Sequence, residues 1–194
     1  VLDLGDLTLH PSVHLSGRTI DQAGRPIKAE LRWGRLDPDT GYVDWVRQRG
    51  AQSDEHGEFS LNGLDPGIWV VVAPGLPAQN PQPYDDSFAS LPSRVDARDG
   101  SVADIELVLR PTGSLILVST MQKDPWPHVR AYDERGLSVA SAWIGRWNEE
   151  TPMRLPPGVY ELVIKRDGMV LERRSIAVGE KPQRLMFEFD SDSK

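Results

Sequence analysis

The sequence predicts an all-β protein made of two tandem antiparallel Greek-key β-sandwiches with about seven strands each. Three observations lead to this prediction. Short apolar segments alternate with turns along the chain, which contains 17 glycines and 16 prolines among 194 residues. Apolar side chains recur at every second position, as at Ile105, Leu107 and Leu109, which is the period of a half-buried strand. The two halves of the chain also share a set of motifs, which indicates an internal duplication.

Four segments of the first half recur in the second half in the same order. They are residues 7–12, repeated at 107–112; 20–24, repeated at 132–136; 64–69, repeated at 155–160; and the closing strand around Leu107 and Leu109, repeated around Phe187 and Phe189. Pro111 stands where the last strand of the first unit should lead into the first strand of the second. We therefore predict one domain over residues 1–110 and another over 111–194, with almost no linker and restricted relative motion.

The first unit is longer than the second, and its extra residues fall in two places. Residues 37–41 form a turn cluster between two strand-like segments, which we interpret as an added hairpin. The proline-rich segment 74–92 is predicted to be a loop, because proline has no backbone N–H for a sheet. In the second unit, Asp167 and Gly168 between two apolar segments predict a tight hairpin.

Residues 1–9 match the closing strand of a unit although they stand at the front of the chain. Because a segment like a closing strand stands first, we expect that the chain belongs to a longer array of such units, or that its first strand completes a neighbouring sheet. The chain opens with Val1 and shows no signal-peptide pattern, so we expect a mature product or an excised fragment.

Part of the first unit resembles a known family. Residues 15–21, 24–27 and 29–31 look like the opening of a carboxypeptidase regulatory-like domain, and 53–61 followed by 64–67 look like its later hallmark. The second unit keeps fewer of these features and resembles a diverged relative. The resemblance implies a transthyretin-like, Ig-like β-sandwich, similar in fold to collagen-adhesin B-type repeats. It also implies a non-catalytic domain that accompanies other domains in secreted and surface proteins.

An aromatic residue follows each Pro-Gly pair of the repeated 64–69 and 155–160 segments at the same spacing. Tyr160 resembles a tyrosine corner, in which the phenol hydroxyl donates a hydrogen bond to the backbone across a Greek-key turn. Trp69 takes the equivalent position in the first unit, where its indole N–H is available for a similar bond.

Composition argues against several functional classes. The net charge of −7 comes from scattered acidic residues, without the basic face typical of nucleic-acid binding. Cysteine is absent, so neither a disulfide nor a thiol-based site can form. The longest apolar runs, such as 68–73, are far too short to cross a bilayer, so we expect no membrane insertion by this segment. The family resemblance implies a secreted, periplasmic or cell-surface location.

Motifs for catalysis or cofactor binding are missing from the sequence. It contains no nucleophile elbow and no phosphate-binding glycine-rich loop. His10 and His14 would share one face of a strand, but we interpret them as solvated residues rather than metal ligands. Asp54, Glu55 and Glu58 around Gly57 are interpreted as turn residues, because a calcium site needs six or more oxygen ligands. We predict no enzyme, no cofactor and no metal.

Aromatic side chains are the remaining candidates for a binding site. Trp126 lies between two prolines and Trp147 in a polar stretch, so both are expected to be exposed. Two further tryptophans would pair across the added hairpin. Trp143, which the repeat aligns with Leu31, is expected in the core. The candidate partner-binding residues are Trp126, Trp147, Trp33, Trp45, Tyr84 and Phe88.

The leading hypothesis is a non-catalytic structural or protein-interaction module of a larger protein. Its partners would be other domains of the same polypeptide or another protein, recognised through an edge strand or the 74–92 loop. The alternative is a carbohydrate-binding module that uses exposed tryptophan faces. A hydrolase would require an acidic pair or a metal site clustered in a cleft.

Overall fold

The computed structural model describes residues 11–39, 41–45, 51–74, 88–120, 126–144 and 149–188. Within these residues the chain forms strands and no helix, as the sequence predicts. The strands of the first half are β1 (Val13–Asp21), β2 (Glu30–Leu36), β3 (Val43–Trp45), β4 (Ala51–Gln52), β5 (Glu58–Leu64), β6 (Ile68–Val72), β7 (Phe88–Ser90), β8 (Ser93–Asp96) and β9 (Val102–Pro111). Those of the second half are β10 (Gly113–Ser119), β11 (His128–Tyr132), β12 (Ser138–Trp143), β13 (Thr151–Leu155), β14 (Gly158–Arg166), β15 (Met169–Val178) and β16 (Gln183–Phe187).

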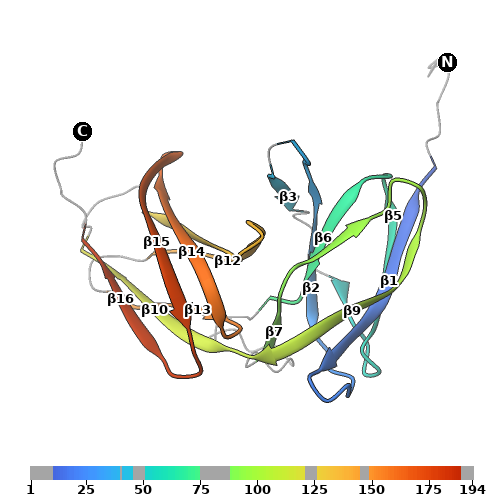
Figure 1. The fold of residues 1–194 in the computed structure, drawn as a ribbon, viewed down its shortest axis with the longest axis horizontal. Helices are drawn as coiled ribbons and strands as arrows, with labels where there is room; N and C mark the ends of the chain where they lie inside the picture. Colours follow the sequence, from blue (N-terminus) through green and yellow to red (C-terminus); the bar gives the residue numbers. More distant parts are fainter. Residues whose placement is uncertain are drawn as a thin grey trace, which may run out of the picture.

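Each half is a sandwich of two sheets. In the first half the strand orders are β5-β1-β9-β7 and β3-β2-β6-β8, with β4 beside β2. In the second half they are β13-β10-β16 and β12-β11-β14-β15. The sandwiches lie side by side and are joined where β9 runs into β10 (Figure 1). The strand orders make β10 the counterpart of β1, β11 of β2, β12 of β3, β13 of β5, β14 of β6, β15 of β8 and β16 of β9.

The predicted antiparallel pairing holds except for the pair of strands that closes each half. β1 pairs with β9 in parallel, with Thr19 opposite Leu107. β10 pairs with β16 in parallel, with Ser119 opposite Phe187. A parallel pair cannot be joined by a tight turn, so a crossover connection must separate its strands in sequence. In each half this pairing therefore joins strands from the two ends of the unit.

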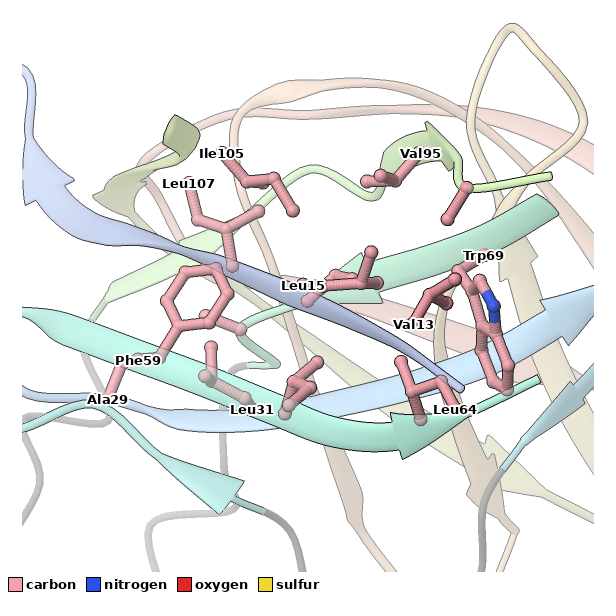
Figure 2. Close-up of a cluster of buried hydrophobic side chains, with 14 of the residues drawn as sticks. Val13, Leu15, Ala29, Leu31, Phe59, Leu64, Trp69, Val95, Ile105 and Leu107 are labelled. Carbon is pink, nitrogen blue, oxygen red and sulfur yellow. The ribbon is translucent and has the colours of Figure 1, made fainter. Parts of the chain in front are cut away.

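In each half, the side chains at every second position of the strands point inward and fill a separate core. In the first half, alternate residues of β1, β5 and β9, such as Leu15, Phe59 and Leu107, meet residues of the facing sheet (Figure 2). In the second half, Leu117, Leu162 and Phe187 belong to a second cluster. Strand β9 ends at Pro111 and β10 begins at Gly113, so Thr112 alone separates them. The division into two domains at residue 110 stays a prediction.

The strand order confirms part of the repeat and corrects the rest. Residues 64–69 connect β5 to β6, and 155–160 connect β13 to β14, as the alignment predicts. Residues 20–24, however, follow β1, whereas 132–136 connect β11 to β12, so matching these two segments is wrong. The counterpart of 132–136 is the turn between β2 and β3. The β2–β3 hairpin is therefore not an addition to the first half, because β11 and β12 form the same hairpin in the second. The segment 7–10 lies outside the described residues.

Strands β1 and β9 approach most closely at a bulge. Leu15 is opposite Val102, but Gly17 is opposite Ile105, so β9 contains one extra residue. Within the bulge Asp104 has a φ of 60°. A Cβ atom at Gly17 would lie 1.9 Å from the carbonyl oxygen of Ile105. Only glycine permits this approach of two backbones.

Gly17→Ala is expected to lower the free energy of unfolding by about 2 kcal/mol, because the backbone must shift to accommodate the methyl group. Gly179→Ala is the control, since a Cβ there meets nothing within 4 Å. Urea denaturation followed by circular dichroism compares the two variants. Equal midpoints for the two variants would contradict the role of the bulge.

Candidate functional site

The turn between β11 and β12 is fixed by the side chain of its first residue. The Asp133 N–H donates to the Leu137 carbonyl and the Gly136 N–H to the Asp133 carbonyl, both at 2.9 Å. One carboxylate oxygen of Asp133 accepts hydrogen bonds from the N–H groups of Arg135 (3.0 Å) and Leu137 (2.9 Å). Gly136 has a φ of 75°, a conformation that glycine adopts without strain. These bonds set the directions in which Arg135 and Leu137 leave the turn.

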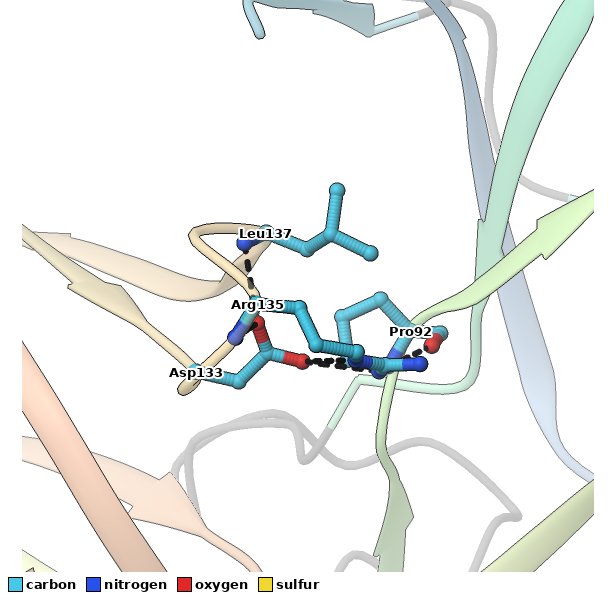
Figure 3. Close-up of polar contacts among 4 residues, drawn as sticks. All are labelled: Pro92, Asp133, Arg135 and Leu137. Carbon is cyan, nitrogen blue, oxygen red and sulfur yellow. Dashed lines mark hydrogen bonds and ion pairs between the residues drawn. The ribbon is translucent and has the colours of Figure 1, made fainter.

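Arg135 contacts the turn and the first half at the same time. Its Nε and Nη2 donate to the other carboxylate oxygen of Asp133 at 2.9 and 2.7 Å. Nη2 also donates to the Pro92 carbonyl at 2.7 Å (Figure 3). Because the two-pronged bond to Asp133 already orients the guanidinium, the contact with Pro92 requires little further loss of side-chain freedom.

Leu137 packs on an apolar patch on the outer face of the sheet β3-β2-β6-β8. It is only 7% exposed. The cluster contains Leu137 together with Leu36, Val43, Ile68 and Val70 of the first half. Removing a leucine side chain from water stabilises the contact by about 2 kcal/mol. We call this cluster, with Arg135 and Pro92, the joint.

The same aspartate turn occurs elsewhere without joining two halves. One oxygen of Asp21 accepts from the N–H groups of Ala23 and Arg25, each at 2.8 Å, and Arg25 Nε donates to the other oxygen at 2.7 Å. Asp54 accepts from the N–H groups of His56 (2.8 Å) and Glu58 (2.9 Å). The prediction that Asp54 is a turn residue is confirmed, because its carboxylate binds backbone, whereas Glu58 begins strand β5.

Equivalent aromatic residues close the β5–β6 and β13–β14 connections, as the sequence predicts. The Tyr160 hydroxyl donates to the Pro156 carbonyl at 2.7 Å. Trp69 Nε1 donates to the Asp65 carbonyl at 3.1 Å. Each donor reaches a carbonyl four residues upstream, so tyrosine and tryptophan make the same bond. Burial raises the pKa of Tyr160 to about 12, and the nearby Asp133 adds to the effect.

The structure does not bring the four candidate aromatic residues that it describes together into one surface. Trp126 is half-buried rather than exposed, and Phe88 packs against the first core. Trp147 and Tyr84 lie outside the described residues. A flat sugar-binding face needs several exposed rings side by side, and the carbohydrate alternative stays a prediction.

The periodicity of apolar residues in the sequence did not reveal the joint, because Leu137 directly follows a turn and is not part of an alternating strand pattern.

Trp33 and Trp45 do not pair across the hairpin. Gly34 is opposite Trp45, which places Trp33 on the other face of β2. Trp33 accordingly packs against the first core and Trp45 against the joint. Trp33 Nε1 is buried without a hydrogen-bond partner among the described residues.

The expectation that Trp143 lies in the core is wrong. Its side chain is 66% exposed. Trp143 is opposite His128 on the outer face of its sheet, and their ring centres lie 4.7 Å apart. The error came from aligning Trp143 with Leu31, because β12 is the counterpart of β3 and not of β2.

An open groove lies over the bulge of β1 and β9. Its lining includes Arg18, Glu58, Asp104 and Glu106. Arg18 and Glu58 form an ion pair at 3.7 Å and are 66% and 60% exposed, and both other acids are exposed. A general acid of a hydrolase usually has a carboxyl group shielded from water. The groove therefore does not supply the shielded acidic pair that hydrolysis would need.

The described residues contain no group of three or more His, Asp or Glu side chains placed to hold a metal ion. His14 and His56 are exposed, and His10 lies outside the described residues. Within the same residues no helix has the length and apolar character needed to span a bilayer.

The sequence matches no family model and no curated protein. Similar solved structures include the Bacillus anthracis TIE protein, at 15% identity and a TM-score of 0.34, over 92% of this chain and 33% of that chain. A streptococcal ancillary pilin has 12% identity and a TM-score of 0.38, over 93% and 63% of the two chains. GBS52, the minor pilin of Streptococcus agalactiae, has 14% identity and a TM-score of 0.32, over 91% and 94%. TM-scores this low carry no inference about function, and the carboxypeptidase regulatory-like resemblance stays a prediction.

Tyr160→Phe is expected to lower the free energy of unfolding by about 1–2 kcal/mol, because the Pro156 carbonyl loses its buried donor. Tyr132→Phe is the control, since no hydrogen bond of its hydroxyl is seen among the described residues and the side chain is half-buried. Urea denaturation at pH 7 measures both. A loss for Tyr132→Phe as large as that for Tyr160→Phe would contradict the corner bond.

Asp21 is expected to make stability depend on acid pH. The Arg25 N–H lowers the pKa of Asp21, and the Arg25 guanidinium and the Ala23 N–H lower it further against the opposing effect of burial. A depressed carboxyl pKa contributes stability above the unfolded pKa of about 4, and this contribution is lost as pH falls through the folded pKa. Asp21→Asn should therefore be less stable than the wild type at pH 6, and this difference should shrink as the pH is lowered through the folded pKa of Asp21. A constant difference across this range would contradict the assignment.

Proposed function

We propose that this chain is a non-catalytic structural module of a larger secreted or cell-surface protein, in which two β-sandwiches are held in one relative orientation. The joint is the observation that supports the proposal. Thr112 provides one connection between the halves, and Arg135 and Leu137 provide a second contact away from it. Two separate attachments restrict the rotation that a single connection would allow. Such a module would space or present the domains attached to it.

The free energy of the joint is large enough to favour one relative orientation of the two halves. The buried Leu137 side chain contributes about 2 kcal/mol, and the charge-assisted bond from Arg135 to Pro92 contributes about 1 kcal/mol more. A total of about 3 kcal/mol favours the docked orientation by roughly a hundredfold. Turn geometry adds specificity, because Asp133 fixes both side chains before the halves meet.

The secreted or surface location is part of the proposal and is supported by the sequence resemblance of residues 12–73 to carboxypeptidase regulatory-like domains. The expected partners are other domains of the same polypeptide or another protein.

Leu137→Ala combined with Arg135→Gln in one double variant is expected to release the two halves from one another while each sandwich stays folded. Residual dipolar couplings should fit one alignment tensor in the wild type and require two in the double variant. Arg25→Gln is the matched control, because Arg25 makes the same bond to Asp21 in a turn that does not meet the other half.

A single tensor in the double variant would overturn the proposal of an orientation fixed by the joint. Loss of the dispersed amide spectrum of either half would instead show that the joint is needed for folding. Thermal unfolding of each variant, followed by the same amide signals, separates these two results.

A further inference from the structure

Strand β5 contains an asparagine–glycine pair at an irregularity in its pairing with β1. The register shifts by one residue between Val13 and Leu15 of β1, so that Asn62 and Gly63 of β5 together face His14. This arrangement is a β-bulge, in which one strand carries an extra residue and the hydrogen-bonded ladder is locally disrupted. Gly63 has a φ of 70°, in the left-handed region that favours glycine. We call this pair of residues the Asn62 bulge.

An asparagine followed by glycine can react with its own backbone. The backbone nitrogen of the second residue attacks the side-chain Cγ of the asparagine and closes a five-membered succinimide ring. Glycine favours the attack, because it has no side chain to shield the nitrogen and has the widest choice of backbone conformations. The other asparagines of the chain, Asn80 and Asn148, precede proline and glutamate. Proline has no N–H to react, and the side chain of glutamate shields its backbone nitrogen.

The structure leaves the Asn62 bulge open to solvent. Both Asn62 and Gly63 are exposed, and a Cβ atom built on Gly63 would meet nothing within 4 Å. Strand β5 is also at the edge of the sheet β5-β1-β9-β7, so β1 is its one neighbour in that sheet. The backbone of the bulge can therefore rotate toward the ring-closing geometry without breaking a ladder on a second side.

A neighbouring side chain donates a hydrogen bond to the group that would react. Ser60 stands two residues before Asn62 on the same exposed face of β5. Its hydroxyl donates to Asn62 Oδ1 at 3.2 Å. Attack on Cγ turns this oxygen into an oxyanion, and a donor already placed at a developing oxyanion lowers the barrier to its formation.

We propose that the Asn62 bulge is a site of self-modification, at which Asn62 is converted to aspartate and isoaspartate in the folded protein. The bond between Gly63 N and Asn62 Cγ forms, the bond from Cγ to Nδ2 breaks, and the side-chain amine leaves as ammonia with the proton of the Gly63 N–H. One water molecule then opens the ring at either carbonyl. The net reaction consumes water, releases ammonia and leaves one new carboxylate on the exposed face of β5.

Incubation of the folded chain in neutral buffer tests the proposal. Anion-exchange chromatography should resolve a product with one more negative charge, and fragmentation mass spectrometry should place the replacement of an amine by a hydroxyl group at Asn62. Asn62→Gln should form no such product at this position, because the longer side chain would have to close a six-membered ring. A parallel sample unfolded in urea measures the rate that the sequence alone permits.

Ser60→Ala separates the contribution of the structure from that of the sequence. Loss of the serine donor should slow the reaction of the folded chain about fivefold, the factor that corresponds to one hydrogen bond. The same substitution should leave the rate in urea unchanged, because the hydrogen bond is then absent in both proteins. Ser141→Ala is the matched control, since Ser141 is an exposed strand residue of the other half. It should react like the wild type.

A folded chain that retains Asn62 while the unfolded chain loses it would overturn the proposal. A folded Ser60→Ala variant that reacts as fast as the wild type would overturn the role of the serine donor, and so would equal slowing in urea. The joint and the orientation of the two halves do not depend on any of these outcomes, because the Asn62 bulge lies within the first sandwich.

Discussion

The parallel pairing of first and last strands is the constraint on which the structure depends. In each half this pairing brings together segments from opposite ends of the unit, β1 with β9 and β10 with β16. Because Thr112 alone separates β9 from β10, the strand that closes the first sandwich leads directly into the strand that opens the second. The two sandwiches are therefore connected through adjacent strands, and the joint adds a second contact between them.

One local device, an aspartate that caps its own turn, serves different purposes in different places. At Asp21 and Asp54 it shapes a turn within the first half. At Asp133 the same carboxylate orients Arg135 and Leu137 toward the other half. The turns differ in the residue that follows the glycine and in whether a sheet face lies next to that residue. In the Asp133 turn this residue is Leu137, which packs on the outer face of the sheet β3-β2-β6-β8.

Whether a sequence interpretation was correct depended on how far apart in sequence the interacting residues are and on which strands pair. The corner at Tyr160 was predictable, because the donor and its carbonyl are four residues apart and belong to one motif. The core positions of β9 were predictable from period two. Trp143 was misplaced, because its environment depends on which strand β12 corresponds to, and the hairpin lengths of the two halves differ. Trp33 and Trp45 were misplaced by one residue of register, which moves a side chain to the opposite face.

Local chemistry in the sequence by itself determined the all-β class, the duplication, the aspartate turns and the aromatic corners. Each of these depends on spacings of a few residues, which the chain specifies directly. The tertiary structure decided the parallel closure, the joint and the outward-facing position of Trp143. Those features depend on segments that are distant in sequence and become neighbours only through strand order and register, and spacing along the chain does not encode either.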